Sequence, residues 1–197
     1  MRRAAALLSL VVCLLAAGCT PDGPKFKASD VTGASFGRDF ALTDHTGKPR
    51  TLADYRGKAV VLFFGYTQCP DVCPTTLALL ASVQKQVAIP GLKVALISVD
   101  PERDTPQQLG KYISSFGGDL IGLTGTPPEI VKATRTFGVA AARVDLPGGD
   151  YTMDHSATIF ALDSDARIVA VFTPPFNGGA LTRDIARLAP VLGSSRG

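Results

Sequence analysis

The chain has 197 residues, of which 46% are hydrophobic and 19% charged, and its formal net charge is +3. This composition indicates a globular protein. It lacks the strongly basic balance of nucleic-acid-binding domains, so we expect no nucleic acid partner.

The N-terminus has the layout of an export signal. Two arginines precede an apolar run, residues 4–17, which is too short for an ordinary membrane span and ends in small residues. The ending LLAAGC resembles a bacterial lipobox, with cleavage before Cys19 and a lipid on its thiol. An ordinary signal peptide or an uncleaved anchor that contains a cysteine is the alternative. We expect residues 1–18 to be removed and the protein to be lipid-anchored to a bacterial membrane, facing the periplasm or extracytoplasmic space.

The rest of the chain divides into a tether, one domain and a short tail. Cleavage leaves 179 residues with a net charge of +1, a size that suits one domain with a well-developed core. Residues 19–35 are rich in Gly, Pro, Ser and charge without a helical or strand period, which predicts a flexible tether. We expect the domain over residues 36–193 and the tail over 194–197.

The domain keeps two of the four cysteines. Cys13 leaves with the signal and Cys19 is assigned to the lipid, so Cys69 and Cys73 remain. A disulfide between residues four apart closes too small a loop to stabilise a domain of this size by restricting its unfolded chain. A purely structural disulfide is therefore disfavoured.

The first predicted element is a β-hairpin. Residues 40–55 (FALTDHTGKPRTLADY) contain a cluster of turn residues at 44–48 and then a short helical turn. His45 lies in this turn, and we interpret it as a solvated loop histidine rather than a ligand.

The centre of the chain predicts a βαβ unit. Residues 59–65 (AVVLFFG) form a continuous apolar run typical of a strand buried on both faces, and residues 92–99 form a second one. Between them, residues 75–87 carry apolar side chains near helical spacing. The two strands are therefore expected to be parallel.

The remaining elements complete an α/β fold. They are two amphipathic helices around residues 109–116 and 130–137, an antiparallel hairpin of strands 157–162 and 168–172, and a last helix over 181–192. A βαβ half joined to a ββα half is a thioredoxin-like arrangement. We predict a central mixed sheet flanked by helices, with an N-terminal β-hairpin.

The two cysteines follow the first buried strand. The carboxyl ends of parallel strands are where open α/β sheets collect ligands. Pro74 suits the first turn of the next helix, and a helix N-terminus should favour thiolate. The spacing of Cys69 and Cys73 places both side chains on one side, where they can close a disulfide or bind one ion. Three intervening residues, instead of the two of a thioredoxin motif, disfavour the redox interpretation without excluding it.

His155, in YTMDHSATIF, is the candidate third ligand. It precedes strand 157–162, in the loop that faces the cysteine loop in a thioredoxin-like fold, where a thioredoxin carries a proline; residues 150–162 contain none. Two thiolates and an imidazole select copper first and zinc second. Such a trigonal set suits Cu(I), and an added oxygen would let it hold Cu(II). Three ligands in surface loops indicate a metal that is meant to leave.

Three stretches resemble the Sco/SenC copper proteins, over about residues 36–190. They are GYTQCPDVCPTTL at 65–77, SVDPERDTP at 98–106 and YTMDHSATIF at 151–160. The resemblance implies a thioredoxin fold that binds copper through Cys69, Cys73 and His155. It also implies a part in building the CuA centre of cytochrome c oxidase subunit II.

Four aspartates near these motifs are weaker candidates. Asp71 could bias thiol pKa values or partner docking, or simply form a turn. Asp100 and Asp104 follow the second parallel strand; we favour turn formation and capping of the next helix over contact with copper or a partner. Asp154 adjoins His155, but neighbouring side chains of an extended segment point apart, so we expect no contact with the imidazole.

Taken together, these features predict a membrane-tethered copper metallochaperone without enzymatic turnover. It would take copper from a periplasmic donor and pass it to the oxidase by ligand exchange. One alternative is a thiol:disulfide oxidoreductase, with Cys69 and Cys73 as the redox pair, that keeps the CuA cysteines reduced. Another is a redox or copper sensor.

Overall fold

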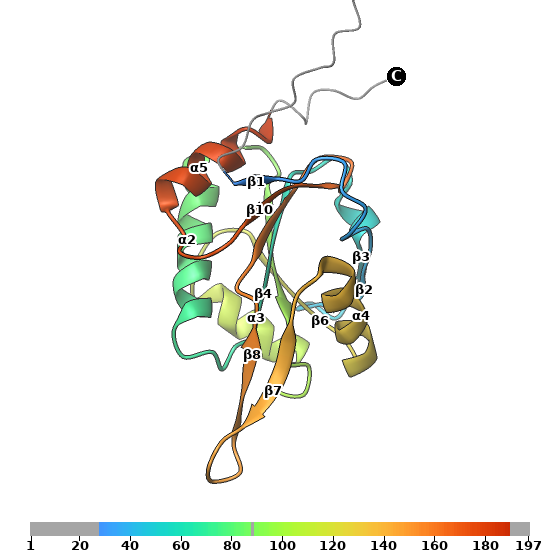
Figure 1. Cartoon of the computed structure of the whole chain (residues 1–197), viewed down its shortest axis with the longest axis vertical. Coiled ribbons are helices and arrows are strands. Elements are labelled where there is room, and N and C mark those ends of the chain that lie inside the picture. Colours follow the sequence, from blue (N-terminus) through green and yellow to red (C-terminus); the bar gives the residue numbers. More distant parts are fainter. Residues whose placement is uncertain (1–27, 88, 190–197) are drawn as a thin grey trace, which may run out of the picture.

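The computed structural model describes residues 28–87 and 89–189, and its centre is one mixed sheet with helices on both faces (Figure 1). The predicted signal peptide, Cys19 and the C-terminal tail lie outside the described residues. In the part of the chain that is described, no helix is long and apolar enough to cross a membrane.

The structure has ten strands and five helical segments among the described residues. The strands are β1 (Ser29–Asp30), β2 (Ala41–Asp44), β3 (Pro49–Thr51), β4 (Val60–Gly65), β5 (Lys93–Ser98), β6 (Leu120–Thr124), β7 (Ala141–Asp145), β8 (Tyr151–His155), β9 (Ile159–Leu162) and β10 (Ile168–Phe172). The helices are η1 (Leu52–Tyr55), α2 (Val72–Val87), α3 (Pro106–Ser114), α4 (Pro127–Phe137) and α5 (Gly178–Ala186). The large sheet has the order β1-β10-β9-β4-β5-β6-β2-β3, while β7 and β8 form a separate two-stranded sheet.

The middle of the sheet is the predicted βαβ unit. Strands β4 and β5 pair in parallel from Val60 opposite Lys93 to Gly65 opposite Ser98, and every residue of β4 is buried. Helix α2 connects them. The continuous apolar run of β4 reflects helices packed on both faces, as is usual for parallel strands.

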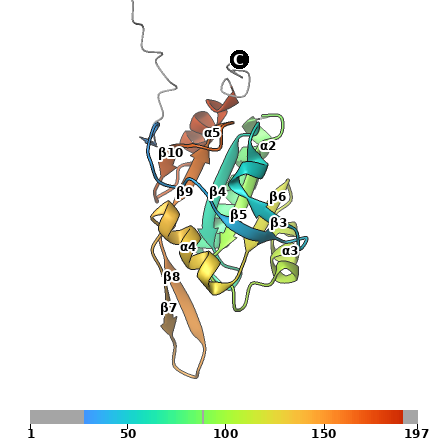
Figure 2. The same cartoon turned by 90° about the vertical axis from the view of Figure 1, so that its right-hand side faces the viewer.

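Helices cover the two faces unequally. Helices α2, α3 and α5 lie on one face of the sheet and α4 on the other (Figures 1 and 2). Beneath α4, the rings of Phe64, Phe137 and Phe160 pack against one another with centroids 5.4–6.0 Å apart. This arrangement confirms the predicted thioredoxin-like α/β class, and β2 and β3 confirm the N-terminal hairpin.

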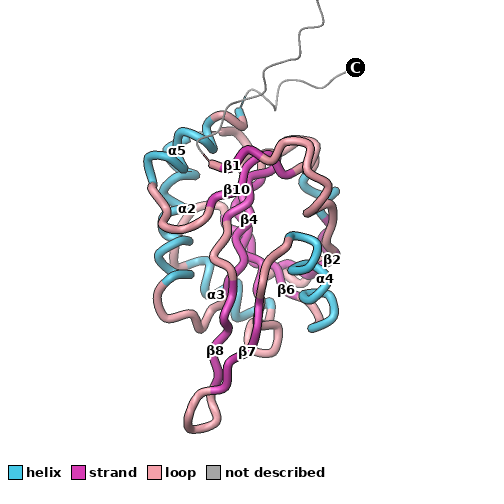
Figure 3. The backbone as a smooth tube through the Cα atoms, in the orientation of Figure 1, coloured by secondary structure: helices cyan, strands magenta, loops and turns pink. Residues whose placement is uncertain are grey.

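Two parts of the sheet structure were not predicted. Strand β6 is a five-residue run interrupted by Gly122, between β5 and β2. The β7–β8 hairpin projects from one end of the molecule (Figure 3), and all five residues of β7 are exposed. An exposed strand has no buried face, so it lacks the alternating pattern that identifies a strand in sequence.

The domain begins earlier than predicted. Ser29 and Asp30, assigned to the tether, form β1 and pair with β10, and the backbone N–H of Ala28 donates to Asp184 Oδ2 at 2.9 Å. A two-residue strand with exposed side chains gives no sequence period. The boundary at residue 36 was therefore wrong, and the packed domain includes residue 28. Strand β1 and helix α5 lie at the end opposite the β7–β8 hairpin (Figure 1).

The β2–β3 turn is held by a buried carboxylate. Asp44, 3% exposed, accepts hydrogen bonds from the backbone N–H groups of Thr46 (2.8 Å) and Lys48 (3.1 Å) and from Arg50 Nε (2.7 Å). The neighbouring His45 is half-buried rather than solvated, because its Nδ1 accepts the backbone N–H of Gly122 at 3.3 Å.

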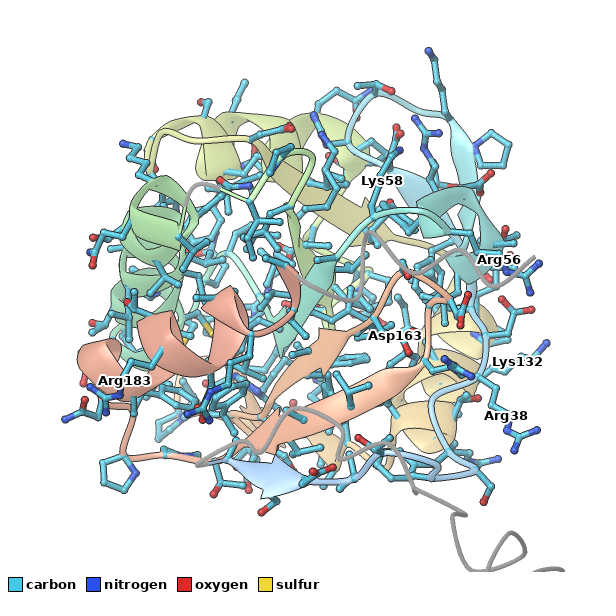
Figure 4. The ribbon with its side chains drawn as sticks, turned by 90° about the horizontal axis from the view of Figure 1, so that it is seen from above. Arg38, Arg56, Lys58, Lys132, Asp163 and Arg183 are labelled. Atoms are coloured by element: carbon cyan, nitrogen blue, oxygen red, sulfur yellow. The ribbon has the colours of Figure 1, made fainter. Side chains whose placement is uncertain are left out.

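The β9–β10 turn is also held by a buried carboxylate. Asp163, also 3% exposed, accepts the backbone N–H of Arg167 at 2.9 Å and its Nη2 at 3.0 Å. Figure 4 looks onto this end of the molecule, where Asp163 lies well inside the outline while Arg183 and Lys132 extend outward on opposite sides. An Asp at the start of a turn and an Arg a few residues later thus hold two separate hairpins.

The substitution Asp44→Asn tests the first of these turns. Burial alone would raise the pKa of Asp44, but the hydrogen bonds from Thr46, Lys48 and Arg50 outweigh it and hold the pKa well below its ordinary value of 3.8. The charged form therefore stabilises the fold above about pH 4, and this contribution is lost progressively as the pH falls further. We expect the variant to lose about 1–3 kcal/mol of unfolding free energy at pH 7 by urea denaturation.

The difference between wild type and Asp44→Asn should shrink between pH 7 and pH 3. Asp145→Asn is the control, because the Asp145 side chain is 78% exposed; we expect it to change stability by no more than about 0.5 kcal/mol. An Asp44→Asn deficit of equal size at both pH values would contradict the assignment.

Candidate metal centre

The cysteine loop connects β4 to α2 as predicted. Helix α2 begins at Val72, so Cys73 and Pro74 lie in its first turn. The backbone N–H of Cys73 donates to Cys69 Sγ at 3.3 Å. Cys69 is half-buried and Cys73 is fully buried, so the two sulfurs differ in their access to solvent.

Gly65, the last residue of β4, makes room for the buried sulfur. A Cβ atom at this position would lie 2.8 Å from Cys73 Sγ, 3.0 Å from the ring of Phe63 and 3.2 Å from Leu96. Cys73 Sγ therefore packs directly against the backbone of Gly65, next to the apolar side chains of Phe63 and Leu96.

Burial reverses the expected effect of the helix N-terminus on Cys73. Desolvation raises the pKa of the Cys73 thiol, and its hydrogen bond with Cys69 raises it further. The prediction that the helix N-terminus favours thiolate is therefore wrong for this residue. Cys73 is a neutral thiol in the metal-free protein, and a bound metal must displace its proton.

His155 completes the group from the other side. It ends strand β8 instead of lying in a loop, and its Nε2 is 3.5 Å from Cys73 Sγ. Nδ1 lies 3.3 Å from the carbonyl oxygen of Ser156, an acceptor that favours the tautomer with hydrogen on Nδ1. Burial lowers the pKa of His155, which favours the neutral ring, and Nε2 then presents its lone pair toward the Cys73 thiol.

The three residues form one compact ligand set. Cys69, Cys73 and His155 each offer one atom, and these atoms lie within 4.8 Å of one another. His155 also borders an open surface hollow of about 680 Å³, between α4 and the β7–β8 hairpin. Neither cysteine lines this hollow, but Cys69 and His155 are both partly exposed, so one ion held between the two sulfurs and the nitrogen would not be fully enclosed.

Asp71 and Asp154 do not join this group. Asp71 is exposed at the position before α2, and its backbone carbonyl accepts the N–H of Thr75 at 3.2 Å, an i→i+4 bond of the first helical turn. Asp154 is exposed at the position before His155, and His155 Nδ1 pairs with a backbone carbonyl instead.

Asp100 and Asp104 support the site through hydrogen bonds to the segments that carry its ligands. Both are buried, at 2% and 0% exposure, and the backbone N–H of Asp104 donates to the carbonyl of Asp100, forming the predicted turn. The predicted helix-capping role belongs instead to Thr105, which caps α3 through its side chain. Neither carboxylate is part of the ligand group.

Asp104 anchors the cysteine loop. Its carboxylate accepts hydrogen bonds from Ser98 Oγ at 2.6 Å and from the backbone N–H and Oγ1 of Thr67 at 3.0 and 2.6 Å. Ser98 ends β5, while Thr67 lies two residues before Cys69. The carboxylate thus ties the loop to the neighbouring strand.

Sequence reasoning missed the supporting residues Gly65, Thr67, Arg103 and Tyr151. Each contacts a candidate site residue or one of the others, and all four stand within the motifs at 65–77, 98–106 and 151–160. Their contacts join segments far apart in the chain, which neither spacing nor periodicity can reveal.

Comparison with known proteins finds relatives that match most of this chain. The SCO1/SenC family model matches residues 28–190. "Protein SCO2 homolog, mitochondrial" of Danio rerio is 38% identical over 152 residues, 75% of this chain and 54% of that protein. "Protein SCO1 homolog, mitochondrial" of Homo sapiens is 34% identical over 159 residues, 76% of this chain and 52% of that protein. The chain thus spans about half the length of these curated relatives.

Two solved structures of similar proteins contain copper. Arabidopsis thaliana ScoI with copper bound has a TM-score of 0.75 and 33% identity, covering 78% of this chain and 98% of that one. Bradyrhizobium japonicum ScoI with copper bound has a TM-score of 0.72 and 42% identity, covering 78% and 99%.

The substitution Gly65→Ala tests the packing of Cys73. The added methyl group would push Cys73 Sγ away from β4, because Cβ atoms in proteins essentially never approach another heavy atom to 2.8 Å. We expect a loss of about 1–3 kcal/mol in unfolding free energy and a weakened affinity for Cu(I), measured by competition with a chelator.

Gly110→Ala is the matched control. Gly110 lies in α3, where an added Cβ would meet its nearest neighbours at 3.7–3.8 Å, an ordinary contact distance. We expect equal or slightly higher stability and unchanged Cu(I) affinity. Wild-type affinity in Gly65→Ala would show that the sulfur does not depend on this space.

Proposed function

The chain belongs to the SCO1/SenC family, and on that premise we propose that it binds copper and delivers it to the CuA centre of cytochrome c oxidase subunit II. One observation carries the proposal: Cys69, Cys73 and His155 bring two sulfurs and one imidazole nitrogen within 4.8 Å of one another. Copper-bound relatives that share the fold support it. Delivery is stoichiometric, without enzymatic turnover.

The ligand set fits copper as cargo. Two thiolates and one imidazole are the soft and borderline donors that copper prefers, and three of them suit trigonal Cu(I). An added oxygen would allow Cu(II) to bind as well. On binding, the metal replaces the proton of the Cys73 thiol, while the neutral His155 already presents Nε2.

The unequal burial of the sulfurs suits transfer by ligand exchange. Cys69 is half-buried and Cys73 fully buried, so an incoming ligand reaches the metal from the side of Cys69 and His155. Each protein ligand is then replaced by one from the receiving site, and copper keeps its oxidation state throughout.

We infer that the protein works on the outer face of a bacterial membrane, held by a lipid on Cys19, and receives copper from a periplasmic donor. The eight residues between Cys19 and Ala28 can span at most about 30 Å. Since β1 lies at the end opposite the β7–β8 hairpin, such an anchor would leave the metal centre facing away from the anchored end (Figure 1).

A second candidate function is reduction of the disulfide formed by the CuA cysteines. The more accessible Cys69 would attack that disulfide, and Cys73 would resolve the mixed disulfide. The products are two reduced CuA thiols and an oxidised Cys69–Cys73 pair. The contact of the Cys73 N–H with Cys69 Sγ at 3.3 Å favours this alternative, because it holds the more accessible sulfur next to the residue that would resolve the mixed disulfide. A sensor that reports the state of the pair would use the same chemistry.

The substitution His155→Ala separates the two functions. It removes the third copper ligand and leaves both thiols, so we expect copper affinity to fall by orders of magnitude and oxidase assembly to fail, with the thiol redox potential little changed. Copper competition assays and oxidase activity of cells carrying the variant measure these outcomes.

His45→Ala is the control, because His45 is the only other histidine and lies in the β2–β3 turn. We expect normal copper affinity and normal assembly. Normal assembly by His155→Ala despite lost copper binding would overturn copper delivery and favour the reductase.

The substitution Cys19→Ser tests the lipid anchor. Without the acceptor thiol we expect no incorporation of labelled fatty acid and loss of the protein from the membrane fraction. Cys13→Ser is the matched control, since this cysteine lies within the predicted signal peptide; it should leave labelling intact. Equal labelling of both variants would contradict lipidation of Cys19.

A further inference from the structure

The third ligand is carried by a hairpin that projects from the described domain. His155 ends β8, and β8 pairs only with β7 in a hairpin that extends beyond the large sheet (Figures 1 and 3). The cysteines, by contrast, adjoin the central strand β4. Contacts between the hairpin and the body therefore determine where the imidazole lies relative to the sulfurs.

Arg103 makes several of these contacts at once. Its Nη1 donates to the backbone carbonyl of Tyr151, the first residue of β8, at 2.9 Å, and its guanidinium lies 3.7 Å from the centre of the Tyr151 ring. Arg103 Nε donates to the buried Asp100, and the Tyr151 hydroxyl donates to the other oxygen of Asp100 at 2.8 Å. Backbone, ring and hydroxyl of Tyr151 are thus all fixed by Arg103 and its partner.

The same loop also holds the cysteines. Asp104, the next residue, accepts both hydrogen bonds from Thr67 in the cysteine loop. A further contact joins the two sides directly, from the Tyr66 hydroxyl to Thr152 Oγ1 at 2.7 Å. The segment from Asp100 to Asp104 therefore touches both the strand that carries the imidazole and the loop that carries the sulfurs.

We propose that Arg103 is a positioning residue for copper binding: by fixing Tyr151 against Asp100, it sets the place of β8 and so of His155. The inference rests on the proposed function, in which His155 ligates copper. Arg103 does not touch the ligand group itself. The planar guanidinium donates in two directions and stacks on a ring at the same time, which a lysine cannot reproduce.

The chain contains a matched control for the loss of such an ion pair. Arg50 donates its Nε to the buried Asp44 in the β2–β3 turn, with the arginine 36% and the aspartate 4% exposed. The corresponding values for Arg103 and Asp100 are 23% and 2%. Arg50→Met and Arg103→Met should therefore cause comparable general destabilisation, and only the second should affect copper.

The experiment measures Cu(II) affinity and the thiolate-to-Cu(II) absorption band of the purified, reduced domain. We expect Arg103→Met to lose about ten- to hundredfold in affinity, as is usual when support of a metal-bound histidine is removed, and to shift the absorption band. Arg103→Lys should recover only part of the loss. Arg50→Met should bind copper as the wild type does.

A double-mutant cycle distinguishes positioning from general structural damage. If Arg103 acts through His155, Arg103→Met should have no further effect on copper affinity in a His155→Ala background. Tyr151→Phe provides a milder variant in case Arg103→Met does not fold. It removes only the hydroxyl bond to Asp100, and we expect a loss of about three- to tenfold that also vanishes in the His155→Ala background.

The outcomes separate this inference from the proposed function. If His155→Ala weakens copper binding but Arg103→Met and Tyr151→Phe do not, or if their effects add to that of His155→Ala, Arg103 does not position the ligand. If His155→Ala itself leaves copper binding unchanged, the ligand assignment fails and the inference with it.

Discussion

The architecture of the metal centre depends on one buried carboxylate. Asp104 has no exposed surface and lies where the ends of β4 and β5 come together, bonded to Ser98 on one side and Thr67 on the other. Burial raises its pKa, while the bonds from Ser98 and Thr67 act in the opposite direction. Without this carboxylate, the buried hydroxyl of Ser98 and the N–H and hydroxyl of Thr67 would lose their hydrogen-bond acceptor. Leaving buried donors unpaired destabilises a protein by more than the net stability that the hydrogen bonds contribute. These hydrogen bonds therefore hold the cysteine loop in place independently of the contacts of Cys69 and Cys73.

Burial favours the uncharged forms of Cys73 and His155. The pKa of Cys73 is raised and that of His155 lowered, and in each case desolvation is the largest cause. A helix N-terminus lowers the pKa of a thiol, whereas apolar burial raises it. Burial has the larger effect on Cys73, whose Sγ packs against Gly65 within the core. Such a site suits a metal that binds thiolate strongly enough to displace a proton. On the proposed function, copper meets this condition.

The sequence was informative where function or burial imposes a local pattern. The apolar runs of β4 and β5 reflect strands covered on both faces, and the Asp-rich turns of the hairpins reflect local hydrogen bonds. The scarcity of cysteine and histidine in the domain led to Cys69, Cys73 and His155. Local pattern did not predict β1 and β7, because all their residues are exposed and no alternation of apolar and polar residues is required. Nor did it reveal the roles of Arg103 and Tyr151, because a contact between residues 48 apart in the chain produces no periodicity in the sequence.

The distribution of the ligands over the fold has a mechanical consequence. Two of them belong to a loop and helix packed on the central strand, where Asp104 and the backbone of Gly65 allow little movement. The third belongs to a two-stranded hairpin with one fully exposed strand. This hairpin contacts the body through Tyr151 at Asp100 and Arg103, through the Tyr66–Thr152 hydrogen bond, and through ring contacts of Phe63 and Tyr66 with His155. Strand β7 is exposed throughout, so the hairpin meets the body chiefly through β8, whereas Cys73 is fully buried in the first turn of a helix. On the proposed function, ligand exchange therefore begins at the partly exposed His155 or Cys69, while the buried Cys73 sulfur retains the ion until the receiving site supplies its own ligands.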